Sequence, residues 1–315
     1  MKIMIIGAGG FVGSAVERAC IASGHIVTCI SRKRGDAKQG HLSGDRNDPE
    51  QISRMVASHA PDAIIDMIAY GTETTEALLD ALDGWDGRYV LISSADVYRN
   101  FGLLHRKEDG TPDLGILAET APLRSNFYPY NLPEPRPDDA PDKWMDGYDK
   151  IPIEAAVQGR RPDWTVCRLP MVYGPANPQP RFNWAIGPLK AGVSILPLPG
   201  PWLDWITTFG FVDNVAAAIA HVTAHSAASR ETFNITDDDD AVAHTGWIER
   251  FATVLNWSGE IARVDDADHP IARATEALDL SVPLNLSGEK LRQLTGFSPP
   301  VSLEDCLIRT ANPST

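Results

Sequence analysis

Three glycines near the start of the chain have the spacing of a loop that binds phosphate. The apolar run Ile3–Ile6 ends at Gly7, and a helix-like pattern begins after Gly10 and continues past Gly13. In such a strand–turn–helix unit, backbone N–H groups at the start of the helix point toward an anion. The first glycine allows a tight turn, the second admits a pyrophosphate, and the third lets the helix pack close to the sheet. Unless it is only a structural turn, we expect a dinucleotide to bind here, at Gly7, Gly10, Phe11, Val12 and Gly13.

The residues after the second predicted strand bear on the choice of dinucleotide. Proteins that prefer NAD place an Asp or Glu there, which accepts a hydrogen bond from the ribose 2′-hydroxyl. Here the strand ends in Ser31 and Arg32, followed by Lys33 and Arg34, and no acid occurs before Asp36. A guanidinium can donate two hydrogen bonds to a phosphate and stack on an adenine ring. These residues therefore favour NADP(H), with NAD(H) as the alternative, unless the basic side chains only form a solvated turn.

The first part of the chain alternates between patterns typical of strands and of helices. Apolar or β-branched runs predict strands at 26–30, 63–67 and 89–92, and the patterns at 51–59 and 74–82 predict helices. This order indicates right-handed βαβ units and a parallel sheet with helices on both faces, which is the doubly wound α/β class. Ligands of such sheets lie at the carboxyl ends of the strands.

The alternation breaks between Asn100 and Asp142, in a stretch rich in proline, aspartate and aromatic residues. It is too long for a plain connection, so we expect a functional loop, and its place after a strand end favours a lid over the ligand. After this stretch the patterns predict a helix at 141–158, a strand at 164–169, a helix at 212–223, a strand at 232–235 and a helix at 246–255.

Composition excludes several classes of protein. The chain has 315 residues, of which 43% are hydrophobic and 22% charged, so it can bury one large core or two smaller ones. It lacks the run of about 18 apolar residues that a membrane span needs, and its short apolar start is not a secretory signal. The net charge of −14 argues against nucleic-acid binding through a basic surface. Four widely spaced cysteines indicate reduced thiols in a cytoplasmic protein.

No metal site is predicted. His221 and His225 have a spacing that suits metal ligands, but no Glu follows the first His. These two residues close a predicted helix, where imidazole suits the carboxyl-terminal end of the helix dipole.

Five further segments form an ordered series along the chain: residues 92–98, 168–175, 211–215, 233–236 and 286–297. With the glycine turn, they resemble the extended short-chain dehydrogenases/reductases, the superfamily of nucleotide-sugar epimerases and dehydratases. The resemblance implies a Rossmann domain that binds a nicotinamide dinucleotide, formed by residues 1–172 and about 206–236. It implies a smaller C-terminal α/β substrate domain, formed by about residues 173–205 and 237–315. Strands near Phe211 and Phe233 are expected to return to the Rossmann sheet. Relatives often form dimers through the helices near 74–82 and 141–158.

The resemblance also implies a catalytic Ser or Thr, a Tyr and a Lys. In this family the Lys lowers the pKa of the Tyr, the Tyr transfers a proton to or from the substrate oxygen, and the hydroxyl side chain donates a hydrogen bond to that oxygen. Ser94 matches the hydroxyl position, and Asp96 matches a second acid of dehydratase relatives, although it could also cap a helix. Asp45 resembles the acid that lies near the adenine amine, or is a turn residue.

The usual Tyr-x-x-x-Lys spacing is absent from the sequence. Four residues after Tyr148 stands Pro152, which cannot replace a Lys. Counting back from Lys150 places Asp146 at the Tyr position, on one helical face with Lys150 and Glu154, while Tyr148 points elsewhere unless Pro152 distorts the helix. Lys150 is expected to bind the nicotinamide ribose hydroxyls, as the resemblance implies, or to form a surface ion pair. The proton donor stays open between Asp146, Tyr148, Tyr128 and Tyr130.

The segments 181–184 and 201–208 stand where relatives contact their substrate. Arg181 could bind a phosphate or a carboxylate. Trp184, Trp202 and Trp205 could stack on a sugar or an aromatic ring, or could belong to a core between the domains.

Together these features predict an NADP(H)-preferring oxidoreductase or epimerase that acts on a sugar-like or small hydroxy/carbonyl substrate by hydride transfer. Two alternatives remain. One is a dinucleotide-binding sensor or interaction protein that has lost the proton relay, and the other is a dehydratase or lyase that uses Asp96.

Overall fold

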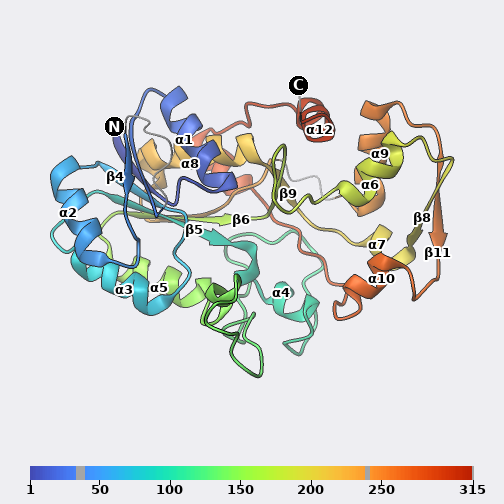
Figure 1. Ribbon diagram of the computed structural model, residues 1–315, viewed down its shortest axis with the longest axis horizontal. Helices are drawn as coiled ribbons and strands as arrows, with labels where there is room; N and C mark the ends of the chain where they lie inside the picture. The colour runs from blue at the N-terminus through green and yellow to red at the C-terminus, as the bar shows by residue number, and fades with distance from the viewer. Residues whose placement is uncertain (33–39, 238–241, 314–315) are drawn as a thin grey trace.

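A parallel sheet of seven strands dominates the computed structural model, which describes residues 1–32, 40–237 and 242–313 (Figure 1). Its strand order is β10-β6-β5-β4-β1-β2-β3, and every neighbouring pair is parallel. The strands are β1 (Lys2–Ile6), β2 (Ile26–Ser31), β3 (His41–Ser43), β4 (Ala63–Asp66), β5 (Arg88–Ser94), β6 (Trp164–Leu169) and β10 (Glu231–Asn234). The α/β doubly wound class expected from the sequence is confirmed.

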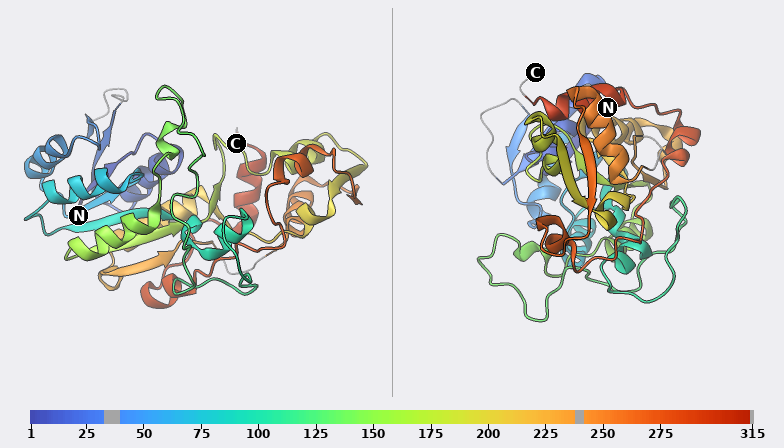
Figure 2. Two further views of the ribbon diagram at one scale, coloured as in Figure 1. Left: turned by 90° about the horizontal axis from the view of Figure 1, so that it is seen from below. Right: turned by 90° about the vertical axis from the view of Figure 1, so that its right-hand side faces the viewer.

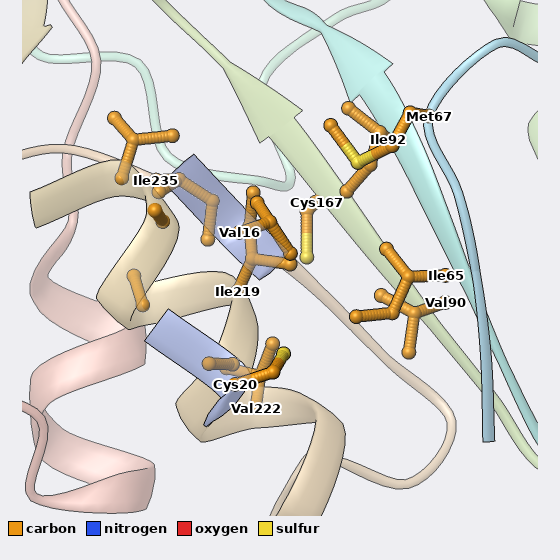
Figure 3. Packing of buried hydrophobic residues seen from close by; sticks show 14 of the residues in the cluster. Val16, Cys20, Ile65, Met67, Val90, Ile92, Cys167, Ile219, Val222 and Ile235 are labelled. Atoms are coloured by element: carbon orange, nitrogen blue, oxygen red, sulfur yellow. The ribbon is translucent and has the colours of Figure 1, made fainter. Parts of the chain in front are cut away.

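Helices cover both faces of this sheet, as Figure 1 shows. One face carries α1 (Phe11–Ala22) and α8 (Val212–Ala224), and the other carries α2 (Pro49–His59), α3 (Thr72–Ala81) and α5 (Lys150–Arg160). Figure 3 shows side chains of the first face, where Val16 of α1 and Ile219 of α8 lie near Cys167 of β6. The central strands are buried on both sides, which explains why their sequences are apolar without alternation.

The strand order reverses between β1 and β4. β1 pairs with β2 on one side and with β4 on the other, so the chain leaves these two neighbouring strands toward opposite sides. In a doubly wound sheet, ligands bind in the crevice that this reversal opens at the carboxyl ends of the strands. The glycine turn follows β1 directly, and residues 67–70 follow β4 at the same edge.

The C-terminal part of the chain has its own core, to the right in Figure 1. Two small parallel ladders pair β7 (Met171–Tyr173) with β9 (Phe209–Phe211), and β8 (Ile195–Pro199) with β11 (Glu260–Val264). The helices of this part are α6 (Asn183–Lys190), α7 (Gly200–Asp204), α9 (His244–Leu255), α10 (Pro270–Thr275) and α12 (Leu303–Ala311). α11 (Glu289–Thr295) instead packs near β10, beside the large sheet.

One of the two strands expected to return to the large sheet does so. β10, which contains Phe233, pairs with β6. The strand that contains Phe211 does not join the sheet, because β9 pairs only with β7 among the described strands. Phe209 and Phe211 pack against Tyr173 in the C-terminal aromatic core, and this packing keeps β9 with that core.

The prediction of a helix over 141–158 is wrong at its N-terminal end. Only a short 3₁₀ helix, η2 (Lys143–Met145), precedes α5, and Gly147 between them has a φ of +75°. α5 begins at Lys150 because Asp149 is its N-cap and accepts a hydrogen bond from the Ile151 N–H. Pro152 therefore lies in the first turn, where its missing N–H costs no hydrogen bond, and it does not distort the helix.

The stretch from His105 to Asp142, which we call the excursion loop, follows β5, the short 3₁₀ helix η1 (Ala95–Val97) and α4 (Arg99–Leu104). Part of it projects from the body of the molecule in green in Figure 2. Elsewhere, the region after Pro175 contains α6 and β8, and a further 3₁₀ helix, η3 (Ser226–Ala228), follows α8. None of the helices among the described residues combines the length and apolarity needed to cross a membrane.

We expect the C-terminal core to lose stability in mild acid through His244. This residue is 1% exposed and lies among the rings of Trp184, Trp202 and Trp205, and burial lowers its pKa to about 4. An unfolded chain has a His pKa of about 6.5, so the neutral ring contributes stability above that pH, and the contribution is lost as the pH falls toward 4. The loss should approach roughly 3 kcal/mol.

Chemical unfolding of the wild type and of His244→Phe between pH 7 and pH 4.5 measures this contribution. The free energy of unfolding of the variant should fall less steeply than that of the wild type as the pH is lowered. Burial also lowers the pKa of His105 to about 4, so this residue should make a second pH-dependent contribution to the free energy of unfolding. Measurements on His105→Gln and on the double variant separate the contributions of the two histidines. If the free energy of unfolding depends on pH equally in the wild type and in His244→Phe, the acid sensitivity does not come from His244.

Candidate active site

The glycine turn has the geometry that its spacing predicted. Gly7 has a φ of +91°, and a Cβ on Gly13 would stand 2.5 Å from the Gly7 carbonyl oxygen. Gly10 is the N-cap of α1, and no side chain caps the helix there. A Cβ on Gly10 would meet no described atom closer than 3.9 Å. The start of α1 thus presents backbone N–H groups with open space before them, as a bound phosphate requires.

Two hollows meet at this turn and share Gly7, Gly10 and Ile68 in their walls. The first, of about 420 Å³, also contains Phe11, Val12 and Gly13 and leads over the ends of β4, β5 and β6. The second, of about 880 Å³, leads over the ends of β2 and β3. A dinucleotide fits this arrangement, because its pyrophosphate would lie at the turn with one nucleoside on each side. We call the two the nicotinamide hollow and the adenosine hollow.

The adenosine hollow contains both residues on which the NADP(H) expectation rests. Ser31 and Arg32 are in its wall, and Arg32 is exposed. Lys33, Arg34 and Asp36 lie outside the described residues. Asp45 is not in the wall, since it forms an exposed turn and accepts a hydrogen bond from the Asn47 N–H.

The neighbour of Asp45, Arg46, does line the adenosine hollow. Its buried guanidinium binds Asp66 at the end of β4 and the Thr75 hydroxyl of α3. Sequence reasoning missed this arginine, because its buried partners lie on elements far along the chain.

Lys150 lies at the floor of the nicotinamide hollow, buried at the start of α5. Its Nζ donates hydrogen bonds to the carbonyls of Ala69 (2.6 Å) and Ile92 (2.9 Å). Burial lowers its pKa to about 8, although Asp66 and Asp96 favour the charged form. An ammonium has three donors, so one remains for a ligand beyond these two carbonyls. The surface ion-pair alternative is wrong for this position, because Lys150 is 3% exposed and bonds to backbone carbonyls.

Tyr148 and Asp96 form a hydrogen-bonded pair beside Lys150. The Tyr148 hydroxyl donates to Asp96 Oδ2 at 3.0 Å, and the Tyr130 hydroxyl donates to the same oxygen at 3.2 Å. Burial raises the pKa of Asp96 above its usual range, while Arg124 and Tyr148 oppose that shift. Burial and the nearby Asp96 raise the pKa of Tyr148 well above its usual value. Because both shifts favour the protonated forms, the pair is suited to hold and pass a proton.

Ser94 completes this group at the carboxyl end of β5. It lies in the wall of the nicotinamide hollow together with Tyr148 and Lys150. Its hydroxyl oxygen accepts a hydrogen bond from the Asp96 N–H at 3.2 Å, so the same serine also caps η1. The structure therefore brings together Ser94, Asp96, Tyr148 and Lys150.

A buried ion pair between Arg124 and Asp149 holds the residues on either side of the site. Their side chains are 0% exposed and meet at 3.1 Å. Arg124 also donates to the backbone carbonyls of Asp96 and Asn126, and Asp149 accepts from the Tyr128 N–H. The pair thus connects η1, the excursion loop and the start of α5. Sequence reasoning missed both residues, although an Asp directly before a helix is an N-cap signal.

Asp146 does not take the Tyr position that the register predicted. It precedes α5, so it cannot share a helical face with Lys150 and Glu154. Its carboxylate binds Arg136 at 2.5 Å and Lys143 at 3.5 Å, and these contacts hold the excursion loop together. Glu154 is buried and pairs with Arg168 at 2.7 Å. Tyr148 occupies the site instead, because the chain is not helical there and its backbone bridges to Gly71.

The residues expected on the substrate side separate into two groups. Arg181 is in the wall of the nicotinamide hollow, and its Nε has no hydrogen-bond partner among the described residues. Trp184 and Trp205 are not in that wall. The indole N–H of Trp184 donates to the Arg181 carbonyl, and that of Trp205 donates to the Val282 carbonyl. Both rings pack around His244 in the C-terminal part. Tyr70, which no motif indicated, lines the hollow instead and packs against Tyr148.

The seven-stranded parallel sheet, the glycine turn and the uncapped start of α1 define a fold of the Rossmann class, and the two hollows could hold a dinucleotide. Residues 3–88 match the sequence model of the NAD dependent epimerase/dehydratase family. Over these residues the chain is similar to that family, in agreement with the resemblance that its motifs carry.

Several known proteins are similar over a larger part of the chain. The chain is 28% identical over 254 residues to the chloroplast stem-loop binding protein of 41 kDa b of Arabidopsis thaliana, a match that covers 75% of this chain and 59% of the relative. A UDP-glucose 4-epimerase from Thermotoga maritima, solved with UDP-glucose, has a TM-score of 0.67 at 16% identity, covering 99% and 97% of the two chains. A dTDP-glucose 4,6-dehydratase from Bacillus anthracis, solved with NAD, has a TM-score of 0.66 at 17% identity, covering 99% and 95%. These likenesses extend the fold to the whole chain.

Replacing Gly10 by Ala should weaken dinucleotide binding without unfolding the protein. The added methyl group meets no described atom closer than 3.9 Å, but it enters the space before the start of α1. We expect the Kd for NADPH to rise by about tenfold or more, because the pyrophosphate can no longer approach the backbone. Fluorescence titration measures the Kd, and thermal melting checks the fold.

Gly159→Ala is the matched control. Its methyl group enters open space on α5, away from the glycine turn. It should leave the affinity unchanged. Equal affinities for Gly10→Ala and the wild type would place the phosphate elsewhere.

Proposed function

We propose that this protein is an NADP(H)-preferring oxidoreductase or epimerase that acts on a sugar-like or small hydroxy/carbonyl substrate. The observation that carries the proposal is the Tyr148–Asp96 pair, whose tyrosine faces the same hollow as the glycine turn, Ser94 and Lys150. A dinucleotide bound across the two hollows, which together form the cofactor groove, would supply or accept a hydride. The side chains around the hollow are suited to handle the accompanying proton and to orient the reactants.

The proposed proton path uses Tyr148 and Asp96 in sequence. During reduction, the Tyr148 hydroxyl gives its proton to the substrate oxygen, and the Asp96 carboxyl replaces that proton through Oδ2. During oxidation, both transfers run in reverse. The raised pKa of Asp96 supports this path, because the carboxyl can hold the proton between the steps. Ser94 would hydrogen-bond the same substrate oxygen, and Lys150 would bind the nicotinamide ribose with its remaining donor.

The preference for NADP(H) rests on Ser31 and Arg32. The described end of β2 carries no carboxylate to accept from a ribose 2′-hydroxyl, and Arg32 is exposed in the wall of the adenosine hollow. A guanidinium there could bind a 2′-phosphate. The matched family is NAD dependent by description, so NAD(H) is the competing cofactor.

Two other functions would use the same groove. A dehydratase or lyase would employ Asp96 as its acid or base and would return the dinucleotide to its starting state. A binding protein without turnover would retain the cofactor groove alone, and the likeness to a stem-loop binding protein keeps that function open. Substrate turnover and nicotinamide absorbance separate the three. Net reduction changes the absorbance, a closed redox cycle changes only the substrate, and a binding protein changes neither.

Arg32→Ala should lower the affinity for NADPH and leave the affinity for NADH unchanged. Losing a charge-assisted contact to a phosphate costs about 1.5–3 kcal/mol, which corresponds to a rise in Kd of roughly ten- to a hundredfold. Paired titrations with the two cofactors measure the difference. Arg18→Ala, which removes another exposed arginine, serves as the control. If the wild type binds NADH as tightly as NADPH, the preference is wrong.

Tyr148→Phe and Asp96→Asn should each lower kcat by about a hundredfold or more while leaving the Kd for NADPH within about twofold. Each variant removes a proton-transfer group but keeps the rest of the side chain, so the shape of the hollow is retained even though Tyr148 is part of its wall. Turnover is followed on a panel of small aldehydes, ketones and keto sugars. Tyr128→Phe is the control, because that ring is 43% exposed on the excursion loop. Unchanged turnover in Tyr148→Phe would contradict the proton path.

A further inference from the structure

Three potential metal ligands meet at the wall of the adenosine hollow. Glu17 comes from α1, Cys29 from β2 and His41 from β3, and their ligand atoms all lie within 4.8 Å of one another. Glu17 Oε1 and His41 Nε2 are 2.8 Å apart. Cys29 and His41 are partners in the β2–β3 register, so the sheet itself holds these two side by side.

The three side chains are sheltered but remain reachable from the hollow. Cys29 is 2% exposed, and the side chains of Glu17 and His41 are 14% and 18% exposed. Glu17 and His41 line the adenosine hollow, whereas Cys29 lies behind them. An ion could therefore enter from the hollow and reach the three ligand atoms.

The donor types select among metal ions. Zinc binds thiolate, imidazole and carboxylate at about 2.0–2.3 Å, and a site with three protein ligands keeps one open position. Magnesium and calcium prefer oxygen ligands, so a thiolate and an imidazole discriminate against them. Donor atoms around a tetrahedral zinc ion lie about 3–4 Å apart, as these bond lengths require. The ligand atoms of the cluster lie within 4.8 Å of one another, which is close to that spacing.

We propose that Glu17, Cys29 and His41 form a zinc-binding site at the wall of the adenosine hollow. On binding, the Cys29 thiol releases its proton to solvent, and the imidazole of His41 binds in its neutral form. Binding therefore strengthens as the pH rises. The competing explanation is a plain ion pair between Glu17 and His41 that joins α1 to β3. That explanation needs no contribution from Cys29, so the cysteine distinguishes the two.

The first experiment is calorimetric titration of the full, chelator-treated protein with zinc chloride. We expect one zinc ion per chain and a Kd that rises at least tenfold in Cys29→Ser and in His41→Gln. Cys20→Ser is the matched control, because Cys20 is a buried thiol on α1 outside the cluster. Absence of stoichiometric binding, or equal affinities for Cys29→Ser and Cys20→Ser, would overturn the proposal.

Cobalt(II) provides a second measurement that does not depend on affinity alone. A cobalt–thiolate bond gives a charge-transfer absorption band, which should appear in the wild type and in Cys20→Ser and disappear in Cys29→Ser. Circular dichroism and thermal melting check that each variant is folded. A wild-type cobalt complex without the thiolate band would remove Cys29 from the site and overturn the proposal. Neither measurement uses a dinucleotide, so the outcome is independent of the proposed function.

Discussion

The arrangement of the candidate active site depends on the buried ion pair between Arg124 and Asp149. Asp149 caps α5, accepts from the excursion loop and binds Arg124, while Arg124 donates to the backbone of η1. Two fully buried charges are costly to desolvate, and removing one partner of such a pair leaves the other uncompensated. Because all of their contacts converge on residues flanking the site, the pair determines where Tyr148, Lys150 and Asp96 lie relative to one another.

This constraint determines which contacts Tyr148 and Lys150 make. With α5 starting at Lys150, Tyr148 is not on the helix but precedes it, and its hydroxyl reaches Asp96. Lys150 directs two donors to the backbone carbonyls of Ala69 and Ile92. Burial and the neighbouring Asp96 carboxyl raise the pKa of Tyr148, whereas the arrangement that the family resemblance implied has a lysine that lowers the tyrosine pKa. In the proposed mechanism, a carboxyl–tyrosine pair takes the place of a lysine–tyrosine pair.

A second buried network connects the sheet to the excursion loop. Glu154 of α5 accepts from Ser93 of β5 and from Arg168 of β6, and Arg168 also reaches the Glu119 carbonyl and the Tyr98 hydroxyl. The Tyr98 hydroxyl in turn donates to Asn234 at the end of β10. Buried networks of this kind are favourable when every member finds a partner. The network joins β5, β6, β10 and α5 to the excursion loop, whereas the tryptophans of the C-terminal part form a separate core around His244.

Local sequence patterns determined the class of the fold and the place of the glycine turn. The apolar strands, their alternation with helices and the Gly7–Gly13 spacing depend on contacts between near neighbours in the chain, and these were predictable. Ser94 and Lys150 could also be placed, because each follows a recognisable segment. The tertiary structure alone decided the position of Tyr148 beside Asp96 and the place of Asp146 outside the hollow, since both depend on where α5 begins. That start is set by Asp149 and by Arg124, which lies 25 positions earlier in the chain.

The meeting of Glu17, Cys29 and His41 likewise requires α1, β2 and β3 to be assembled. Periodicity reports which face of an element is buried, but it carries no information about which distant side chain will neutralise a buried charge.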